Sequence, residues 1–107
     1  MTTPLDLTPG RRPDGTALLT VAGEIDMSNT AALADAVTAA LRGTAGLLVL
    51  DLTAVDYLDS AGLAVLFDHA ERIEVITGPL LAPVLTISGL TGLVTVHNTE
   101  PKKPHTT

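Results

Sequence analysis

A short, unbroken apolar segment near the middle of the chain, Gly46–Leu52, is the feature that most restricts the fold. Its sequence, Gly-Leu-Leu-Val-Leu-Asp-Leu, is too short for a typical helix. Continuous apolar runs of this length are typical of central strands that have neighbours on both faces. The segment therefore predicts a central β-strand with both faces covered by other elements.

Apolar residues at helical spacing occur before and after this strand. The first predicted helix is capped by Ser28 or Asn29, since both side chains accept a hydrogen bond from the unpaired N–H groups of a first turn. Its stop is Gly43. Its apolar face carries Leu33, Ala36, Val37, Ala40 and Leu41. The second predicted helix runs from Ser60 to about Arg72. Its apolar positions are Leu63, Leu66, Phe67 and Ala70.

Apolar and β-branched stretches next to turn residues predict further strands at Leu5–Thr8, Thr16–Ala22 and Leu93–His97. The β-branched stretch Ile73–Thr77 predicts another strand, although no turn residue separates it from the preceding helix. A short helix should begin at Pro83, because proline costs about 3 kcal/mol inside a helix. The order is strand, strand, helix, strand, helix, strand, short helix, strand. It predicts an α/β fold with crossover helices packed on one mixed β-sheet. We assign residues 1–98 to this domain and residues 99–107 to a flexible C-terminal tail.

Composition limits the partners and the compartment. Six basic and twelve acidic residues give a net charge of -6, which repels a phosphate backbone, so we expect no nucleic-acid partner. No apolar run reaches the roughly 20 residues that span a bilayer, and Met1–Pro4 does not resemble the start of a signal peptide. Cysteine is absent. We therefore expect a cytoplasmic protein without direct membrane insertion, whose mainly aliphatic core also holds Tyr57 and Phe67.

The segment Val55–Leu63 joins the central strand to the second helix, and ligands of open α/β sheets bind at such strand ends. Glu24–Asp26 has the same position between an earlier strand and the first helix, so we expect the two connections side by side. Ser60 stands at the helix start, where a serine cap contributes about 1 kcal/mol. Asp59 is similarly favoured there by the helix dipole. On residue type alone, capping is the simpler explanation of Ser60.

A catalytic role for Ser60 would need a base within hydrogen-bond reach, and the nearest histidine in sequence is His69. Nine residues of helix separate the two by about 13.5 Å and half a turn, so their side chains point to opposite sides. We therefore expect no enzyme activity. Carboxylates that Mg²⁺ favours are present at Glu24, Asp26, Asp51, Asp56 and Asp59. Their spacing does not require a metal, and we expect neither a metal nor another cofactor.

Four segments, in order, resemble the motifs of the STAS domain, a fold shared by sulfate-transporter tails and bacterial anti-sigma factor antagonists. Gly23–Asp26 resembles the family's Gly-Glu-[Ile/Leu]-Asp, and Leu48–Leu52 resembles its central strand. Val55–Leu63 contains Asp-Ser-Ala-Gly-Leu, which resembles the family's signature around a serine, and Ser88–Leu90 resembles its Thr-Gly-Leu. The resemblance extends from about residue 18 to residue 96 and implies a single STAS domain.

In the antagonist branch of that family a partner phosphorylates the serine after the aspartate, so the resemblance assigns phosphorylation to Ser60. It places the partner-binding surface at Asp26, Asp59, Ser60, Ala61, Gly62 and Leu63. The implied function is that of an anti-sigma factor antagonist, which releases a sigma factor until an anti-sigma factor with serine kinase activity phosphorylates Ser60. Whether a phosphatase resets the site is left open. The alternative is a non-switching STAS scaffold subunit of a transporter or larger signalling complex.

The chain departs from the family in two places beside this site. Its second helix runs directly into the strand at Ile73, where the family usually has a longer helix and a turn with glycine. Pro83 falls inside the family's next helix. Both departures are expected to change the partner surface.

Overall fold

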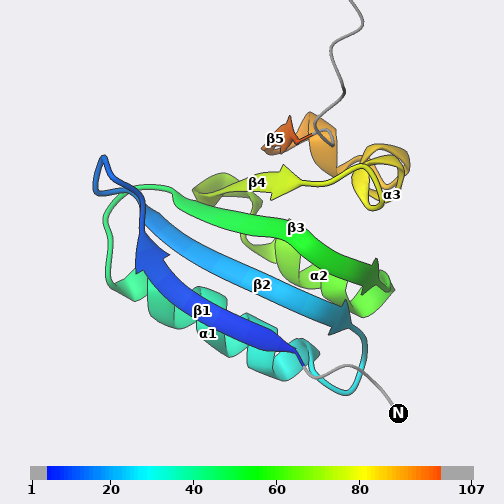
Figure 1. Ribbon diagram of the computed structural model, residues 1–107, viewed down its shortest axis with the longest axis horizontal. Coiled ribbons are helices and arrows are strands. Elements are labelled where there is room, and N and C mark those ends of the chain that lie inside the picture. Colours follow the sequence, from blue (N-terminus) through cyan, green and yellow to red (C-terminus); the bar gives the residue numbers. More distant parts are fainter. Residues whose placement is uncertain (1–4, 100–107) are drawn as a thin grey trace, which may run out of the picture.

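The structure is a computed structural model that describes residues 5–99, and a five-stranded sheet of order β1-β2-β3-β4-β5 forms its centre (Figure 1). The strands are β1 (Asp6–Arg11), β2 (Ala17–Ile25), β3 (Leu48–Leu58), β4 (Ile73–Thr77) and β5 (Thr95–Asn98). The helices are α1 (Thr30–Arg42), α2 (Ser60–Asp68) and α3 (Ala82–Ile87), with 3₁₀ turns η1 (Ala70–Arg72) and η2 (Leu90–Gly92). The predicted α/β fold and order of elements are confirmed.

The right-handed crossovers between parallel strands place the helices on one face of the sheet. β1 pairs antiparallel with β2, whereas each later strand is parallel to the one before it and is added on the same side. Right-handed crossovers that all step in one direction pass over the same face. Figure 1 shows α1 and α2 behind the sheet and no helix in front of its central strands. The prediction that both faces of the central strand are covered is therefore wrong.

The continuous apolar run of β3 has a different cause. Its helix-facing residues in the core are Leu48, Leu50 and Leu52. Val49 points to the opposite face and stands outside that core cluster, yet it is only 1% exposed. Its register partners on the neighbouring strands are Leu18 and Glu74, whose longer side chains flank it. Neighbours within the sheet, rather than a second layer, exclude water from Val49.

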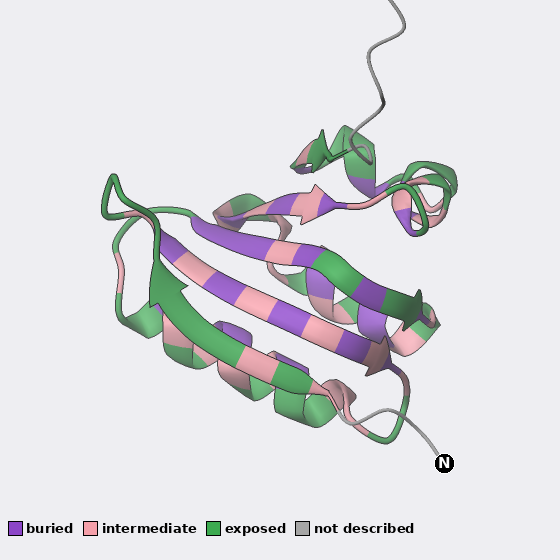
Figure 2. Ribbon diagram, in the orientation of Figure 1, coloured by how far each residue is buried: buried purple, intermediate pink, exposed green. Residues whose placement is uncertain are grey.

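The core lies between the sheet and the helices and is aliphatic, as the composition predicts. Its buried helical residues include Leu33, Val37 and Leu41 of α1, Leu66 of α2 and Leu85 of α3. Figure 2 shows the alternation of buried and half-buried residues along β2, which faces the helices with every second side chain. Phe67 packs against this core. Tyr57 is 51% exposed, so its predicted core position is wrong, because it pairs with Glu24 on the face without helices.

Two strands extend further than the sequence indicates. β2 continues past Gly23 to Ile25, and β3 continues past Leu52 to Leu58. The pairing between them contains two register shifts, one of which follows Gly23 directly. The predicted stop at Gly23 is wrong because glycine adopts its φ of 112° at little cost, so the strand passes through the irregularity. As a result, β3 reaches well beyond the end of its pairing with β4.

The edge strands also differ from their predicted bounds. β1 extends to Arg11 although it contains Pro9, which an edge strand tolerates because the missing N–H can face solvent. β5 begins at Thr95 instead of Leu93, since η2 occupies the preceding turn. Thr99 donates its backbone N–H to the carbonyl of Thr77 at 2.8 Å. The rest of the predicted tail, residues 100–107, lies outside the described residues.

The two later helices differ from their predicted bounds. α2 ends at Asp68, and the predicted end at Arg72 lies in η1, which leads directly into β4. α3 begins at Ala82, one residue before the predicted Pro83, and the proline occupies the first turn, where its missing N–H costs nothing. Within residues 5–99, the structure has no helix with the length and hydropathy needed to cross a membrane.

Candidate functional site

The loops that follow β2 and β3 lie next to each other at one edge of the sheet (Figure 1). The two strands are parallel, and the register pairs their last residues, Ile25 and Leu58. The backbone N–H of Asp59 donates a hydrogen bond of 3.2 Å to the carbonyl of Ile25 and ties the second loop to the first. The predicted proximity of Glu24–Asp26 to Val55–Leu63 is therefore confirmed.

Asp59 caps α2. Its backbone is extended, with φ -92° and ψ -177°, and its side chain accepts a 3.0 Å hydrogen bond from the N–H of Gly62. Its carbonyl accepts another from the N–H of Leu63, also at 3.0 Å. Ser60 is thus the first helical residue and is exposed. The capping explanation of Ser60 is wrong, because the preceding aspartate makes that bond and leaves the Ser60 hydroxyl for another role.

Gly62 allows α2 to approach the sheet. A Cβ at this buried position would stand 2.5 Å from Cδ1 of Leu58 and 2.6 Å from Cγ2 of Ile25. Carbon atoms in contact are about 3.5–4.0 Å apart, so a larger residue does not fit without displacement. Gly62 is among the predicted partner-binding residues, but it faces the core. Ala61 and Leu63, from the same prediction, are half-buried.

Asn29 shapes the first loop. Its Oδ1 accepts a 3.0 Å hydrogen bond from the N–H of Asp26, and its Nδ2 donates at 2.8 Å to the carbonyl of Glu24. Asn29 holds the predicted N-cap position of α1, but its side chain makes no capping bond. It folds the loop back on the end of β2 instead. The sequence analysis missed this role, which an asparagine three residues after a strand-end aspartate could have suggested.

Ser28 holds the carboxylate of Asp26 in place. The Ser28 hydroxyl and backbone N–H both donate to Oδ1 of Asp26, the latter at 2.9 Å. The side-chain bond has the larger effect, and together the two bonds hold the pKa of Asp26 below its ordinary value of 3.8, since they stabilise the charged form. Asp26 therefore carries a negative charge at neutral pH.

Two large apolar side chains are exposed at this edge of the sheet. Met27 in the first loop is 81% exposed, and Tyr57 near the end of β3 is 51% exposed. The sequence analysis did not identify either as a surface residue, because apolar type by itself favours burial. Side chains of this size contribute about 1.5–3 kcal/mol when they are buried. Met27 lies in the loop after β2, and Tyr57 lies near the end of β3 on the face without helices, so both offer apolar contact close to the strand ends.

The described arginines are confined to one end of the sheet. The arginines all lie at the end where β3 and β4 begin, at Arg11, Arg12, Arg42 and Arg72. The guanidinium of Arg11 donates to the carbonyl of Gly43, and that of Arg72 donates to the carbonyls of Thr44 and Gly46. The opposite end has Glu24, Asp26, Asp56 and Asp59. Among the described residues it has no lysine or arginine, so the Ser60 edge is acidic.

The two histidines in the described part of the chain, His69 and His97, do not lie beside Ser60. His69 is the C-terminal cap of that helix, at the end opposite Ser60, and its Nδ1 is 2.9 Å from the carbonyl of Val65. His97 lies on β5 with its Nε2 3.5 Å from Oε1 of Glu74. The helical spacing correctly predicts that His69 and Ser60 are far apart.

The carboxylates considered for Mg²⁺ do not converge. Over residues 5–99, no group of three or more His, Asp or Glu side chains is placed to hold a metal ion. Asp51 makes local bonds instead, because its Oδ1 accepts from the N–H of Thr53 at 3.0 Å and from the Thr53 hydroxyl at 2.7 Å. Its side chain thus stabilises β3 where the strand becomes irregular.

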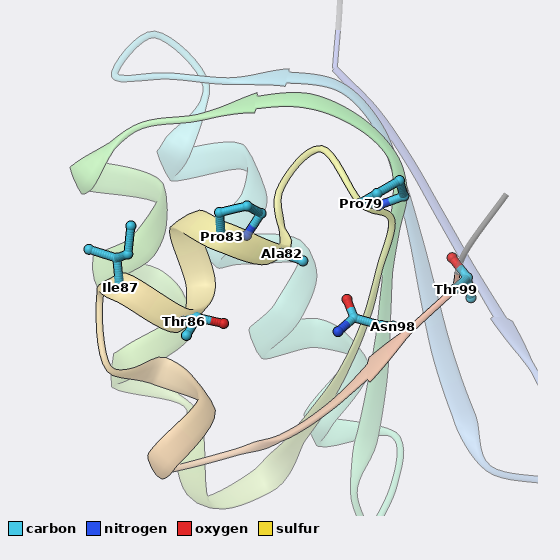
Figure 3. Close-up of a pocket in the computed structure, with 7 residues that line it drawn as sticks. All are labelled: Pro79, Ala82, Pro83, Thr86, Ile87, Asn98 and Thr99. Atoms are coloured by element: carbon cyan, nitrogen blue, oxygen red, sulfur yellow. The ribbon is translucent and has the colours of Figure 1, made fainter.

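A groove of about 470 Å³ lies beside α3 (Figure 3). It is lined by Pro79, Ala82, Pro83, Thr86, Ile87, Asn98 and Thr99. Ile87, which is 86% exposed, and Pro83 form part of its apolar wall. None of the lining residues is titratable, so the groove offers contact surface and the hydroxyls of Thr86 and Thr99, but no acid or base that could activate them.

Comparisons with known sequences find relatives for most of the chain. The family model described as "Mlab, STAS domain" matches residues 10–95. Two curated relatives from Mycobacterium tuberculosis strains, named anti-sigma-F factor antagonist RsfB, are 40% identical over 60 residues, which is 56% of this chain and 49% of theirs. The chain therefore spans about half the length of the curated relatives it matches.

Two solved structures show how far the fold is shared. An anti-sigma factor antagonist from Mycobacterium paratuberculosis is 29% identical, with a TM-score of 0.82 and 92% of each chain covered. The anti-sigma factor antagonist SpoIIAA in its unphosphorylated form has a TM-score of 0.67 at 13% identity, covering 92% of this chain and 90% of that one. At 13% identity the likeness shows the fold alone. The predicted fold class is confirmed by both.

Proposed function

Because this chain belongs to the STAS-domain family, we propose that it is an anti-sigma factor antagonist controlled at Ser60. Unmodified protein binds an anti-sigma factor in the cytoplasm and thereby releases a sigma factor for transcription. Phosphorylation of Ser60 by the serine kinase activity of that anti-sigma factor ends the binding. The names of the relatives from two mycobacteria support the antagonist activity. The exposed position of Ser60 at the start of α2 supports the switch.

The observation that carries the proposal is the position of Ser60 at the start of α2. Its side chain is exposed, and Asp59 already makes the capping bond. A phosphate there adds about -1.5 to -2 charges. The positive end of the helix dipole favours an anion by about 0.3–1 kcal/mol, so α2 does not have to unfold to accept it. The modification therefore acts on the surface and leaves the fold intact.

The same phosphate opposes docking of a partner. Unmodified Ser60 lies at an edge where Met27 and Tyr57 offer apolar contact and Asp26 and Asp59 offer fixed carboxylates. A dianion adds bulk and must lose its hydration when a partner packs closely over it. A penalty of about 4 kcal/mol lowers affinity roughly 1,000-fold, at 1.4 kcal/mol per decade.

The contact surface for the anti-sigma factor comprises Asp26, Asp59, Ser60, Ala61 and Leu63. Gly62 contributes by spacing, because it sets the distance between α2 and the strand ends without facing solvent. The acidic character of this edge favours a partner that is basic or neutral where it meets Asp26 and Asp59.

Binding to the host's candidate anti-sigma factors tests the surface. Ser60→Ala should bind like wild type, whereas Ser60→Asp should bind at least about tenfold more weakly, because it introduces charge at the contact. Thr91→Asp is the matched control, since it adds the same charge at an exposed position in η2. If wild type and Ser60→Asp bind the same anti-sigma factor with equal affinity, the proposed switch is contradicted.

Phosphorylation itself is tested by incubation with ATP and each candidate anti-sigma kinase, followed by mass spectrometry. Phosphate should appear on Ser60 of the wild type and be absent from that position in Ser60→Ala. Absence of phosphate on wild-type Ser60 under every kinase would favour the non-switching scaffold, which stable co-purification with a transporter or larger complex would then support.

A further inference from the structure

Within residues 5–99, no helix covers the second face of the sheet, and the strand register defines what that face presents. Residues that are paired directly share a face, so rows of side chains cross the strands. One row contains Leu18, Val49 and Glu74, and the next contains Thr20, Asp51, Ile76 and His97. These residues, together with Ala22 and Glu24 of β2, form the surface that we call the open face.

The open face presents apolar side chains on both sides of its central pair, Thr20 and Asp51. Leu18, Ala22 and Ile76 are half-buried, and Val49 between the neighbouring strands is almost fully buried. Each of the half-buried side chains still has apolar area in contact with water. Covering that area is favourable in proportion to its extent, so a second layer on this face would gain hydrophobic stabilisation.

The charged groups of the open face have one sign. Glu24, Asp51 and Glu74 project from adjacent strands on this side. Within the described part of the chain the face has no lysine or arginine, because the arginines lie at the far end and Arg11 and Arg72 bond to carbonyls beside α1. His97, with its Nε2 3.5 Å from Glu74, is the basic group closest to these acids on the face.

We propose that the open face docks a cationic amphipathic helix of a partner protein. The apolar stripe of such a helix covers Leu18, Ala22 and Ile76, while its lysines or arginines extend outward to the carboxylates. Helices on both faces of a mostly parallel sheet are a stable layer arrangement, which this chain completes on one face only. A second copy of the chain fits less well, because stacked open faces bring carboxylates of like charge together.

This docking surface is separate from the Ser60 switch and does not depend on it. The open face is centred on the middle of β2, β3 and β4 and reaches the strand ends only at Glu24, whereas Ser60 follows the end of β3 on the side of the sheet that carries α2. Charge substitution at Ser60 is therefore expected to leave helix docking unchanged, within about twofold.

The test uses a peptide of about 14 leucine and lysine residues, placed at helical spacing so that it is about 21 Å long when helical. Binding is measured by titration into the isotope-labelled protein while its backbone amide shifts are recorded. Two double variants remove equal charge from opposite sides. Asp51→Asn with Glu74→Gln alters the open face and keeps one acceptor oxygen on each side chain, which is enough for the bonds that Oδ1 of Asp51 accepts from Thr53. Asp35→Asn with Asp68→Asn alters exposed positions on α1 and α2.

The amides of Leu18, Thr20, Ala22 and Ile76 should shift on peptide addition. The open-face double variant should bind about tenfold more weakly, and the helix double variant within about twofold of wild type. The same peptide with glutamate in place of lysine should not bind. Equal weakening by the two double variants would show attraction to net charge alone and overturn the proposal. Shifts confined to the Ser60 edge would also overturn it, as would a dimer in sedimentation equilibrium that the open-face substitutions dissociate.

Discussion

Gly62 lies against Ile25, so closely that a Cβ on the glycine would stand 2.6 Å from Cγ2 of the isoleucine. The carbonyl of the same Ile25 accepts the hydrogen bond of Asp59. One residue at the end of β2 therefore receives both a packing contact and a backbone bond from the segment around Ser60. These two contacts fix the first turn of α2 relative to the first loop, and they position Ser60 without involving its own side chain.

Gly62→Ala should lower the free energy of unfolding by about 1–3 kcal/mol, because the added methyl group overlaps Leu58 and Ile25 in a packed core. Urea denaturation measures the change. Gly92→Ala is the control, since no heavy atom lies within 4 Å of a Cβ at that position. Equal stability of the two variants would show that α2 can move away from the strand ends at little cost.

Asp59→Ala should reduce stability by about 1 kcal/mol, because it removes the side chain that caps α2. Ser60→Ala should stay within about 0.5 kcal/mol of wild type, as exposed substitutions without such a role usually do. Asp59→Asn preserves a capping oxygen and should retain most of the stability. Thermal unfolding at matched protein concentration measures these differences in stability. A larger loss of stability in Ser60→Ala than in Asp59→Ala would show that Ser60, and not Asp59, caps α2.

Asn29→Ala should destabilise the protein by about 1–3 kcal/mol, because two hydrogen bonds that join the first loop to β2 are lost. The amide of Asp26 should also exchange its hydrogen faster, since Oδ1 of Asn29 is its acceptor. Asn29→Asp keeps that oxygen but replaces the donor to Glu24 by a charged acceptor, so the Asp26 amide should remain protected although the bond to Glu24 is lost. Unchanged exchange in Asn29→Ala would contradict the role of this side chain.

Ser28→Ala should raise the pKa of Asp26 toward the ordinary value of 3.8, because the hydroxyl bond is the largest cause of its depression. A lowered pKa in the folded state means that the carboxylate stabilises the fold above the unfolded pKa and that this contribution is lost as pH falls through the folded pKa. Titration of the carboxyl carbon by NMR from neutral to acidic pH measures the shift. Ser88→Ala, whose hydroxyl donates to the carbonyl of Leu85, should leave the titration of Asp26 unchanged.

The sequence alone predicts the order of helices and strands, because each element has its own spacing of apolar residues. The apolar face of α1 and the buried positions of β4 are properties of single segments. The extension of β3 is different, because it depends on register shifts against β2, and a register belongs to two paired strands and not to one segment. The predicted core position of Tyr57 rests on its apolar type alone, although the alternation that buries Leu50 and Leu52 places Tyr57 on the face without helices.

The capping residue of α2 in the candidate site cannot be predicted from residue types alone. Asp59 and Ser60 are both good capping residues, and their sequence cannot decide between them. The close approach at Gly62 decides it, because packing against Ile25 sets where α2 begins. Likewise, the apolar run around Val49 has the composition of a strand buried on both faces. However, each parallel strand is added on the same side of the one before it, so the crossover helices cover only one face of the sheet.

β3 pairs with β4 only as far as Asp51, so residues 52–58 have a strand neighbour on one side alone. Unpaired backbone groups along an extended strand are a template for pairing with another chain, and hence for aggregation. The register shifts against β2 distort this segment, and the exposed carboxylate of Asp56 adds charge to it. Bulges and charges are the devices by which natural sheets discourage such pairing. The irregular approach to Ser60 therefore also helps to keep separate molecules from joining edge to edge.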